Sequence, residues 1–127
     1  MGALRTVILA AVVSLSSGLP SLAAEERPVD IFAACAGRLS ALMEFQWLFD
    51  NADADVTEAQ RARVLELLEA AMEPGEERAV LSLRISVKQA HSVLLSRATF
   101  NDDPADAAWA AEQAAHHESA CRAFLLG

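Results

Sequence analysis

Apolar residues recur every three or four positions through most of the chain after residue 23, the spacing that places them on one face of an α-helix. Val64, Leu68 and Ala71 form one such stripe, and Val80 and Leu83 begin another. Capping and helix-breaking residues divide the chain into four expected helices. Their expected bounds are residues 30–49, 55–73, 76–98 and 103–126.

Acidic residues mark the expected helix starts. Asp30, Asp55 and Asp103 are the predicted N-caps of the first, second and fourth helices, because a carboxylate can accept hydrogen bonds from the free amides of the first turn. Glu58 adds a capping-box partner to the second helix, and Pro104 suits the first position of the fourth.

The connections are short, as at Pro74-Gly75, so consecutive helices should be antiparallel neighbours. The sequence therefore predicts an all-α fold, a small four-helix up-down-up-down bundle that forms one domain over residues 24–127. An aromatic content of 6% and few Gly and Pro residues argue against a β-sandwich or barrel. A hydrophobic fraction of 54% argues against disorder.

Residues 1–23 have the pattern of a secretory signal peptide. A single positive charge at Arg5 precedes a short apolar run, and Ser21 and Ala23 supply small residues at the expected cleavage site. Cleavage is expected after Ala23, with cleavage after Ala24 or an uncleaved anchor as alternatives. The apolar run is shorter than the ~20 residues of a membrane span, so no span is expected after cleavage. With the Ala- and Arg-rich composition, this pattern indicates a periplasmic or secreted bacterial protein.

The two cysteines are candidates for a disulfide. Cys35 lies near the start of the first expected helix and Cys121 near the end of the fourth, so an antiparallel arrangement places each ~7.5 Å from the same end of the bundle. In an oxidising compartment this placement predicts a bond that closes the bundle. A redox or metal-binding thiol pair is the alternative, although the chain has no C-x-x-C motif.

The histidines offer an alternative function, a metal- or haem-binding bundle. His117 and Cys121 share a helical face at a spacing that can hold a metal, and His116 or His117 with Met43 is a conceivable haem ligand pair. His91 is expected about seven residues, or ~10 Å of axial rise, from the level of His117, too far for one coordination sphere. No cofactor is therefore expected. The lack of a phosphate loop or an H-E-x-x-H motif also argues against an enzyme.

The net charge of −8 argues against nucleic acid as a partner, because no overall basic surface is available to displace counterions from phosphates. One segment is nevertheless basic. No Asp or Glu occurs between Arg78 and Asn101, and Arg84, Lys88 and His91 form a stripe at i, i+4 and i+7. The stripe is either a small docking strip for anions or is neutralised by acidic residues on the neighbouring helices.

The end of the first expected helix is apolar on all sides around Phe45, Trp47 and Phe49, and Trp109 on the fourth helix is expected near the same height. A bundle helix normally exposes a polar face, so these residues form either an aromatic cap on the core or a contact surface. The favoured hypothesis is a non-enzymatic periplasmic or secreted protein that binds through this surface. Its partner would be another protein, a second copy of the chain or an apolar ligand.

Overall fold

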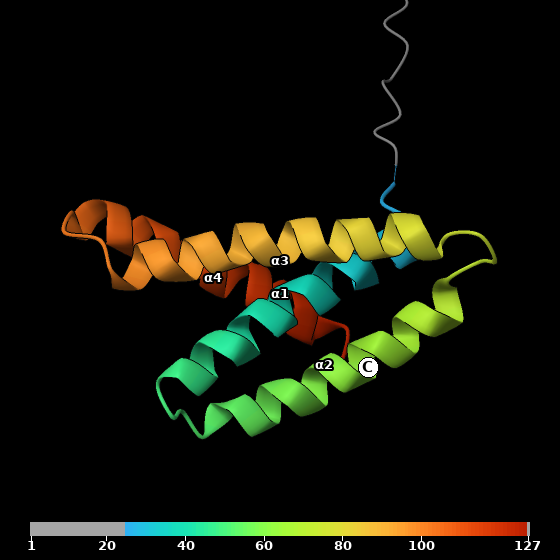
Figure 1. The fold of residues 1–127 in the computed structure, drawn as a ribbon, viewed down its shortest axis with the longest axis horizontal. Coiled ribbons are helices and arrows are strands. Elements are labelled where there is room, and N and C mark those ends of the chain that lie inside the picture. Colours follow the sequence, from blue (N-terminus) through green and yellow to red (C-terminus); the bar gives the residue numbers. More distant parts are fainter. Residues whose placement is uncertain (1–24, 127) are drawn as a thin grey trace, which may run out of the picture.

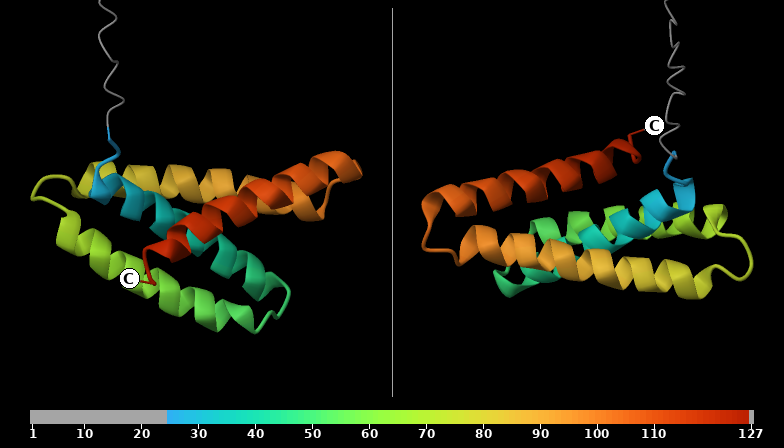
Figure 2. Two further views of the ribbon diagram at one scale, coloured as in Figure 1. Left: turned by 180° about the vertical axis from the view of Figure 1, so that it is seen from behind. Right: turned by 90° about the horizontal axis from the view of Figure 1, so that it is seen from above.

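The computed structural model describes residues 25–126, which fold into four α-helices joined by short loops (Figure 1). The helices are α1 Pro28–Leu48, α2 Asp53–Ala71, α3 Glu77–Thr99 and α4 Pro104–Ala123. Consecutive helices run in opposite directions, which confirms the predicted all-α up-down bundle (Figure 2). The predicted signal peptide lies outside the described residues. Among residues 25–126, no helix combines the length and the apolar character that a membrane span requires.

The helix starts agree only in part with the predicted caps. α1 begins at Pro28, and Asp30 lies within its first turn, where it accepts a hydrogen bond from Arg27 Nε at 3.1 Å. The prediction that Asp30 caps this helix is therefore wrong, because proline at the first position starts the helix earlier. At Asp30 the carboxylate still interacts favourably with the positive end of the helix dipole.

The start of α2 differs in the same direction. The side chain of Asn51 accepts a hydrogen bond from the backbone amide of Asp53 at 2.9 Å, and the helix begins at Asp53. Asp55 thus lies in the first turn, and its predicted role as the N-cap is wrong. Ala52 occupies the N-cap position, and the Asn51 side chain before it satisfies a free amide two residues later.

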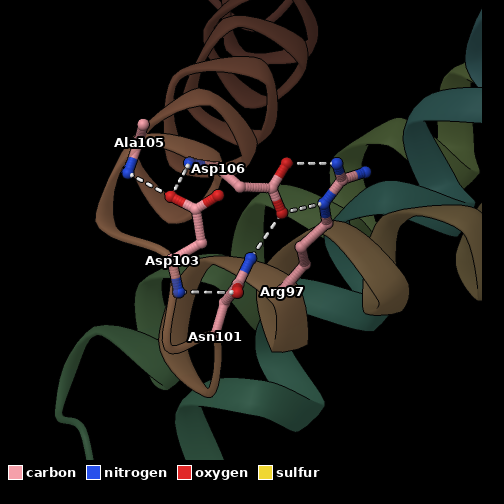
Figure 3. A network of polar contacts seen from close by, with 5 residues as sticks. All are labelled: Arg97, Asn101, Asp103, Ala105 and Asp106. Carbon is pink, nitrogen blue, oxygen red and sulfur yellow. Dashed lines mark hydrogen bonds and ion pairs between the residues drawn. The ribbon is translucent and has the colours of Figure 1, made fainter.

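The predicted start of α4 is confirmed. Asp103 Oδ1 accepts from the amides of Ala105 and Asp106 at 3.0 Å and 3.4 Å (Figure 3). Asn101 Oδ1 in turn accepts from the Asp103 amide at 3.0 Å. The side chains of Asn101 and Asp103 therefore both stabilise the turn between α3 and α4. The far end of α4 is shorter than expected and stops at Ala123 rather than Leu126.

α1 lies at the centre of the bundle. It packs along both α2 and α3, whereas α4 packs mainly on α3 and touches α1 over a shorter stretch (Figure 2). Neighbours on several sides explain why α1 lacks a polar face over most of its length. The buried residues of α1 are Val29, Ala33, Cys35, Ala36, Gly37, Leu39, Ser40, Ala41, Leu42 and Met43.

Gly37 marks the closest approach of α1 and α3. A Cβ atom added at Gly37 would lie 2.5 Å from the backbone oxygen of Arg84 and 3.0 Å from the backbone nitrogen of Lys88. Because both atoms belong to the α3 backbone, no rotamer change can relieve the contact. The two helices can therefore pack at this distance only with glycine at this position.

We expect Gly37→Ala to lower the free energy of unfolding by about 1–2 kcal/mol. Alanine gains ~1 kcal/mol of helix propensity, but overpacking against a fixed backbone costs ~1–3 kcal/mol, and separating the helices also disturbs their neighbours. Urea denaturation followed by circular dichroism measures the difference. Ala62→Gly at an exposed position of α2 reports the propensity term alone. A Gly37→Ala variant more stable than the wild type would contradict the close approach.

Candidate binding surface

Aromatic rings join the end of α1 to the end of α3. Phe45 and Phe49 lie with their ring centroids 5.0 Å apart, and Phe49 stacks on Phe100 at 6.3 Å. Phe45 is half-buried, whereas Phe49 and Phe100 are exposed. Phe45 packs against the buried Ala41, Leu42 and Leu95, so it connects the other two rings to the core. The aromatic end predicted from the sequence is therefore both a cap on the core and an exposed surface.

An open groove runs beside these rings between α1 and α3. Phe45 and Leu48 of α1 line one side, and Ser92 and Ser96 of α3 form its floor. The same two serines border a second depression that continues along α3 to Val93 and Phe100. The two depressions form one surface, because Ser92 and Ser96 belong to both. We call it the apolar groove, defined by Phe45, Leu48, Ser92, Val93, Ser96 and Phe100.

The walls of the apolar groove are unusually exposed for large apolar side chains. Leu48 is 77% exposed, Phe100 68% and Val93 63%. Single exposed apolar residues are ordinary on protein surfaces, but a contiguous set around a depression is typical of a binding site.

Three charged residues border the apolar groove, and two of them are acidic. Glu44 lines the α1 side and Asp102 the far end at the turn into α4. Arg97 also lines the groove, but its guanidinium forms a two-point ion pair with Asp106, with Nε donating to Oδ2 at 2.6 Å (Figure 3). This pair holds the pKa of Asp106 below its usual range, chiefly through the Arg97 hydrogen bonds, and Asn101 adds a further donor. Asp106 therefore neutralises Arg97, as Lys88 neutralises Glu44, and among residues 25–126 Asp102 forms no ion pair.

The two tryptophans of the predicted surface lie outside this cluster. Trp109 is half-exposed on α4, and the guanidinium carbon of Arg97 sits 4.9 Å from its ring centroid, a cation–π contact. Trp47 is 50% exposed, and the ring contacts found within residues 25–126 do not include it. The structure therefore joins Phe45 and Phe49 to Phe100, connects Trp109 to the groove only through Arg97, and leaves Trp47 apart.

The predicted basic strip is divided by the structure. Lys88 Nζ pairs with Glu44 Oε1 at 2.5 Å, which directs it toward α1. His91 is 2% exposed and contacts α4, so its assignment to a surface strip is wrong. The three residues do have helical spacing along α3. However, α3 packs against α1 on one side and α4 on another, so Lys88 contacts α1 and His91 contacts α4.

His91 instead forms a buried pair with Glu118. Its Nε2 lies 3.0 Å from Glu118 Oε1, and the Glu118 side chain is 12% exposed. A carboxylate only accepts hydrogen bonds, so Nε2 donates. Arg122 approaches the other carboxylate oxygen at 3.9 Å, while His91 Nδ1 is buried without a hydrogen-bond partner.

The expected separation of His91 and His117 is wrong, because their ring centroids lie 6.3 Å apart. Side chains tilt toward the N-terminus of their own helix, so on antiparallel α3 and α4 these two rings converge and shorten the axial offset. Burial lowers the pKa of His117, and the nearby Arg38, His91 and His116 lower it further. The His117 ring is therefore held in its neutral form at neutral pH. Within the described part of the chain, no three His, Cys, Asp or Glu side chains are placed to hold a metal ion.

The predicted disulfide is confirmed. Cys35 and Cys121 are bonded with their Cα atoms 5.4 Å apart, and both are buried in the main core cluster. The bond joins α1 to α4, the two helices that share the shorter contact.

The chain matches no protein-family profile, no curated protein and no solved structure.

The sequence did not identify Ser92, Val93 and Ser96 as site residues, because they meet the apolar end of α1 only when α1 packs on α3. A partial signal exists on α3. Ser92 and Ser96 are small residues at i, i+4 beside the apolar Val93, the pattern of a shallow furrow on a helix surface.

Proposed function

We propose that this protein is exported and acts by binding an amphipathic, basic helix of a partner protein in the apolar groove. The observation that carries the proposal is the run of exposed apolar walls around the Ser92–Ser96 floor, with acids at its edge. This deepens the interpretation of the sequence, which favoured binding through the aromatic end of the first helix.

The shape of the groove favours a helix as the bound element. Ser92 and Ser96 are one turn apart on the same face of α3, and their small side chains leave a furrow between the larger walls. An amphipathic helix inserts its apolar anchors into such a furrow at i, i+3, i+4 and i+7.

The charge of the surroundings favours basic residues on that helix. Arg97 is paired with Asp106 and Glu44 with Lys88, which leaves Asp102 as the groove-lining acid without an ion pair among residues 25–126. The whole chain also carries a net charge of −8. Complementary charge speeds encounter and selects among partners. A second copy of the chain would bring the same acidic edge against itself, so self-association is disfavoured.

Export is supported by two independent features. The signal-like pattern of residues 1–23 is one, and the buried Cys35–Cys121 bond, of a kind that persists in oxidising compartments, is the other.

A synthetic Lys/Leu amphipathic peptide should bind the protein, and Val93→Lys should weaken that binding at least ~10-fold, or about 1.4 kcal/mol. The new ammonium group would lie on the groove wall, opposing both the apolar contact and the positive peptide. Val56→Lys on α2 is the matched control, because Val56 is 58% exposed and the change in net charge is the same. Fluorescence anisotropy measures the affinities, and we expect less than ~2-fold loss in the control.

Three results would contradict the proposal. The first is equal binding of a Glu/Leu peptide with the same apolar spacing. The second is equal weakening by Val93→Lys and Val56→Lys, which would reveal a long-range charge effect alone. The third is a wild-type dimer in sedimentation experiments that Val93→Lys dissociates, which would assign the groove to a second copy.

A further inference from the structure

A smaller pocket lies between α1, α2 and α3, and Gly37 is part of its lining. Its volume is about 180 Å³, and three cationic side chains line it: Arg61 of α2, and Arg84 and Lys88 of α3. Glu44 contributes one carboxylate. Three cations against one anion make this pocket locally positive in a protein whose overall charge is −8. We call it the cationic pocket.

The three cations of this pocket differ in whether an acidic side chain neutralises them. Lys88 is paired with Glu44 at 2.5 Å. Arg61 Nε donates to Ser40 Oγ at 2.7 Å, and Ser40 donates in turn to the backbone oxygen of Ala36 at 2.7 Å. In the region spanning residues 25–126, neither Arg61 nor Arg84 forms an ion pair with an acid.

The Ser40 contact holds Arg61 in place without using its charge. A neutral hydroxyl accepts from Nε, so the two terminal nitrogens keep their donors for another acceptor. An arginine fork of this kind matches the paired oxygens of a carboxylate or phosphate. Arg84 of α3 also lines the pocket and is a second arginine beside it.

We propose that the cationic pocket binds a small oxyanion, a phosphate or carboxylate group, held between Arg61 and Arg84 with Lys88 as the third cation. The volume is below the ~300–1,000 Å³ of sites for drug-sized ligands, so the bound species is small. The apolar side chains of Met43, Leu81 and Ile85 complete the lining and suit a short hydrocarbon part attached to the anionic group. This site shares Glu44 with the edge of the apolar groove, but its three cations do not line that groove.

Glu44 competes with the ligand for the same cations. Its carboxylate occupies Lys88 in the free protein, so an incoming anion must either displace it or share the lysine. Removing this charge should therefore strengthen binding. A merely structural role of the Glu44–Lys88 pair would not produce this effect.

The test titrates the purified protein with sodium phosphate and, separately, with sodium succinate at constant ionic strength, with chloride as the balancing anion. Isothermal calorimetry measures affinity, and the ¹⁵Nε resonances of Arg61 and Arg84 report the site. We expect saturable binding with a Kd below about 1 mM for at least one anion, which corresponds to roughly −4 kcal/mol. The tighter of the two identifies the ligand as a phosphate or as a carboxylate.

Three variants decide the assignment. Arg84→Gln should weaken binding at least tenfold. Arg78→Gln, at an exposed position of the same helix, carries the same charge change and should alter binding less than twofold. Glu44→Gln should tighten binding at least threefold. Absence of saturation with both anions, equal weakening by Arg84→Gln and Arg78→Gln, or no gain with Glu44→Gln would overturn the proposal. If Arg84→Gln fails to fold, the Glu44→Gln measurement alone decides.

Discussion

Reduction of the Cys35–Cys121 disulfide is expected to lower the free energy of unfolding by about 4–5 kcal/mol. The bond joins residues 86 positions apart, and in the chain-entropy account a loop of this length restricts the unfolded chain by about that amount. A domain of this size has ~5–15 kcal/mol of stability in all, so the reduced protein should be near the limit of folding.

The geometry of the bundle adds to this effect. α4 packs mainly on α3 and shares only a short contact with α1, and the disulfide lies within that contact. Both sulfur atoms sit in the core cluster with Leu39 and Val64, so the bond also fixes the side chains around it. Loss of the bond should therefore loosen α4 before the α1–α2–α3 core.

Urea denaturation with and without a phosphine reductant measures the change. A variant with both Cys35→Ala and Cys121→Ala is the control, because it should show the reduced stability and no response to reductant. An unchanged denaturation midpoint on full reduction, with free thiols verified chemically, would show that packing alone holds α4 in place.

Features that depend on local chemistry could be predicted from the sequence. The Asp103-Pro104 start of α4 needs only neighbouring residues and was predicted correctly. The disulfide followed from equal heights in an antiparallel pair, which tolerates errors in crossing angle because both cysteines lie near one end of the bundle. The predicted starts of α1 and α2 were wrong, because Pro28 and Asn51 favour helix starts before the acids that follow them.

Features that depend on the direction of side chains across helices could not be predicted. Axial rise alone placed His91 and His117 far apart, but the tilt of each side chain toward its own N-terminus brings the rings together. The floor of the apolar groove at Ser92 and Ser96 likewise exists only because α1 crosses α3 beside it. When one helix is surrounded by the others, residues at helical spacing can face any of several neighbouring helices. The periodicity of the sequence does not identify which neighbour each residue contacts.

The His91–Glu118 pair shows most clearly how the packing of the helices changes the interpretation of a residue. Glu118 interrupts the apolar side of α4 in the sequence, and in the structure it reaches His91 across the α3–α4 contact. Arg122 lies one turn further along α4 at 3.9 Å from the same carboxylate, and Arg122 Nε also donates to Gln60 of α2 at 3.3 Å. This polar chain therefore links α3, α4 and α2, and it extends from the buried His91–Glu118 pair to the partly exposed Arg122.

We expect His91→Leu and Glu118→Leu each to lower the free energy of unfolding by about 2–4 kcal/mol, because each leaves its partner buried without a hydrogen bond. The double variant should be much less destabilised than the sum of the two, since two apolar side chains of similar size leave no unpaired group. A double-mutant cycle from urea denaturation gives the coupling, expected at about 2 kcal/mol or more. Glu118→Gln keeps an acceptor for His91 and should cost only about 1 kcal/mol. Losses that add within ~0.5 kcal/mol would show that His91 and Glu118 do not stabilise one another. The buried, unpaired Nδ1 of His91 would then indicate that the imidazole ring is loosely held.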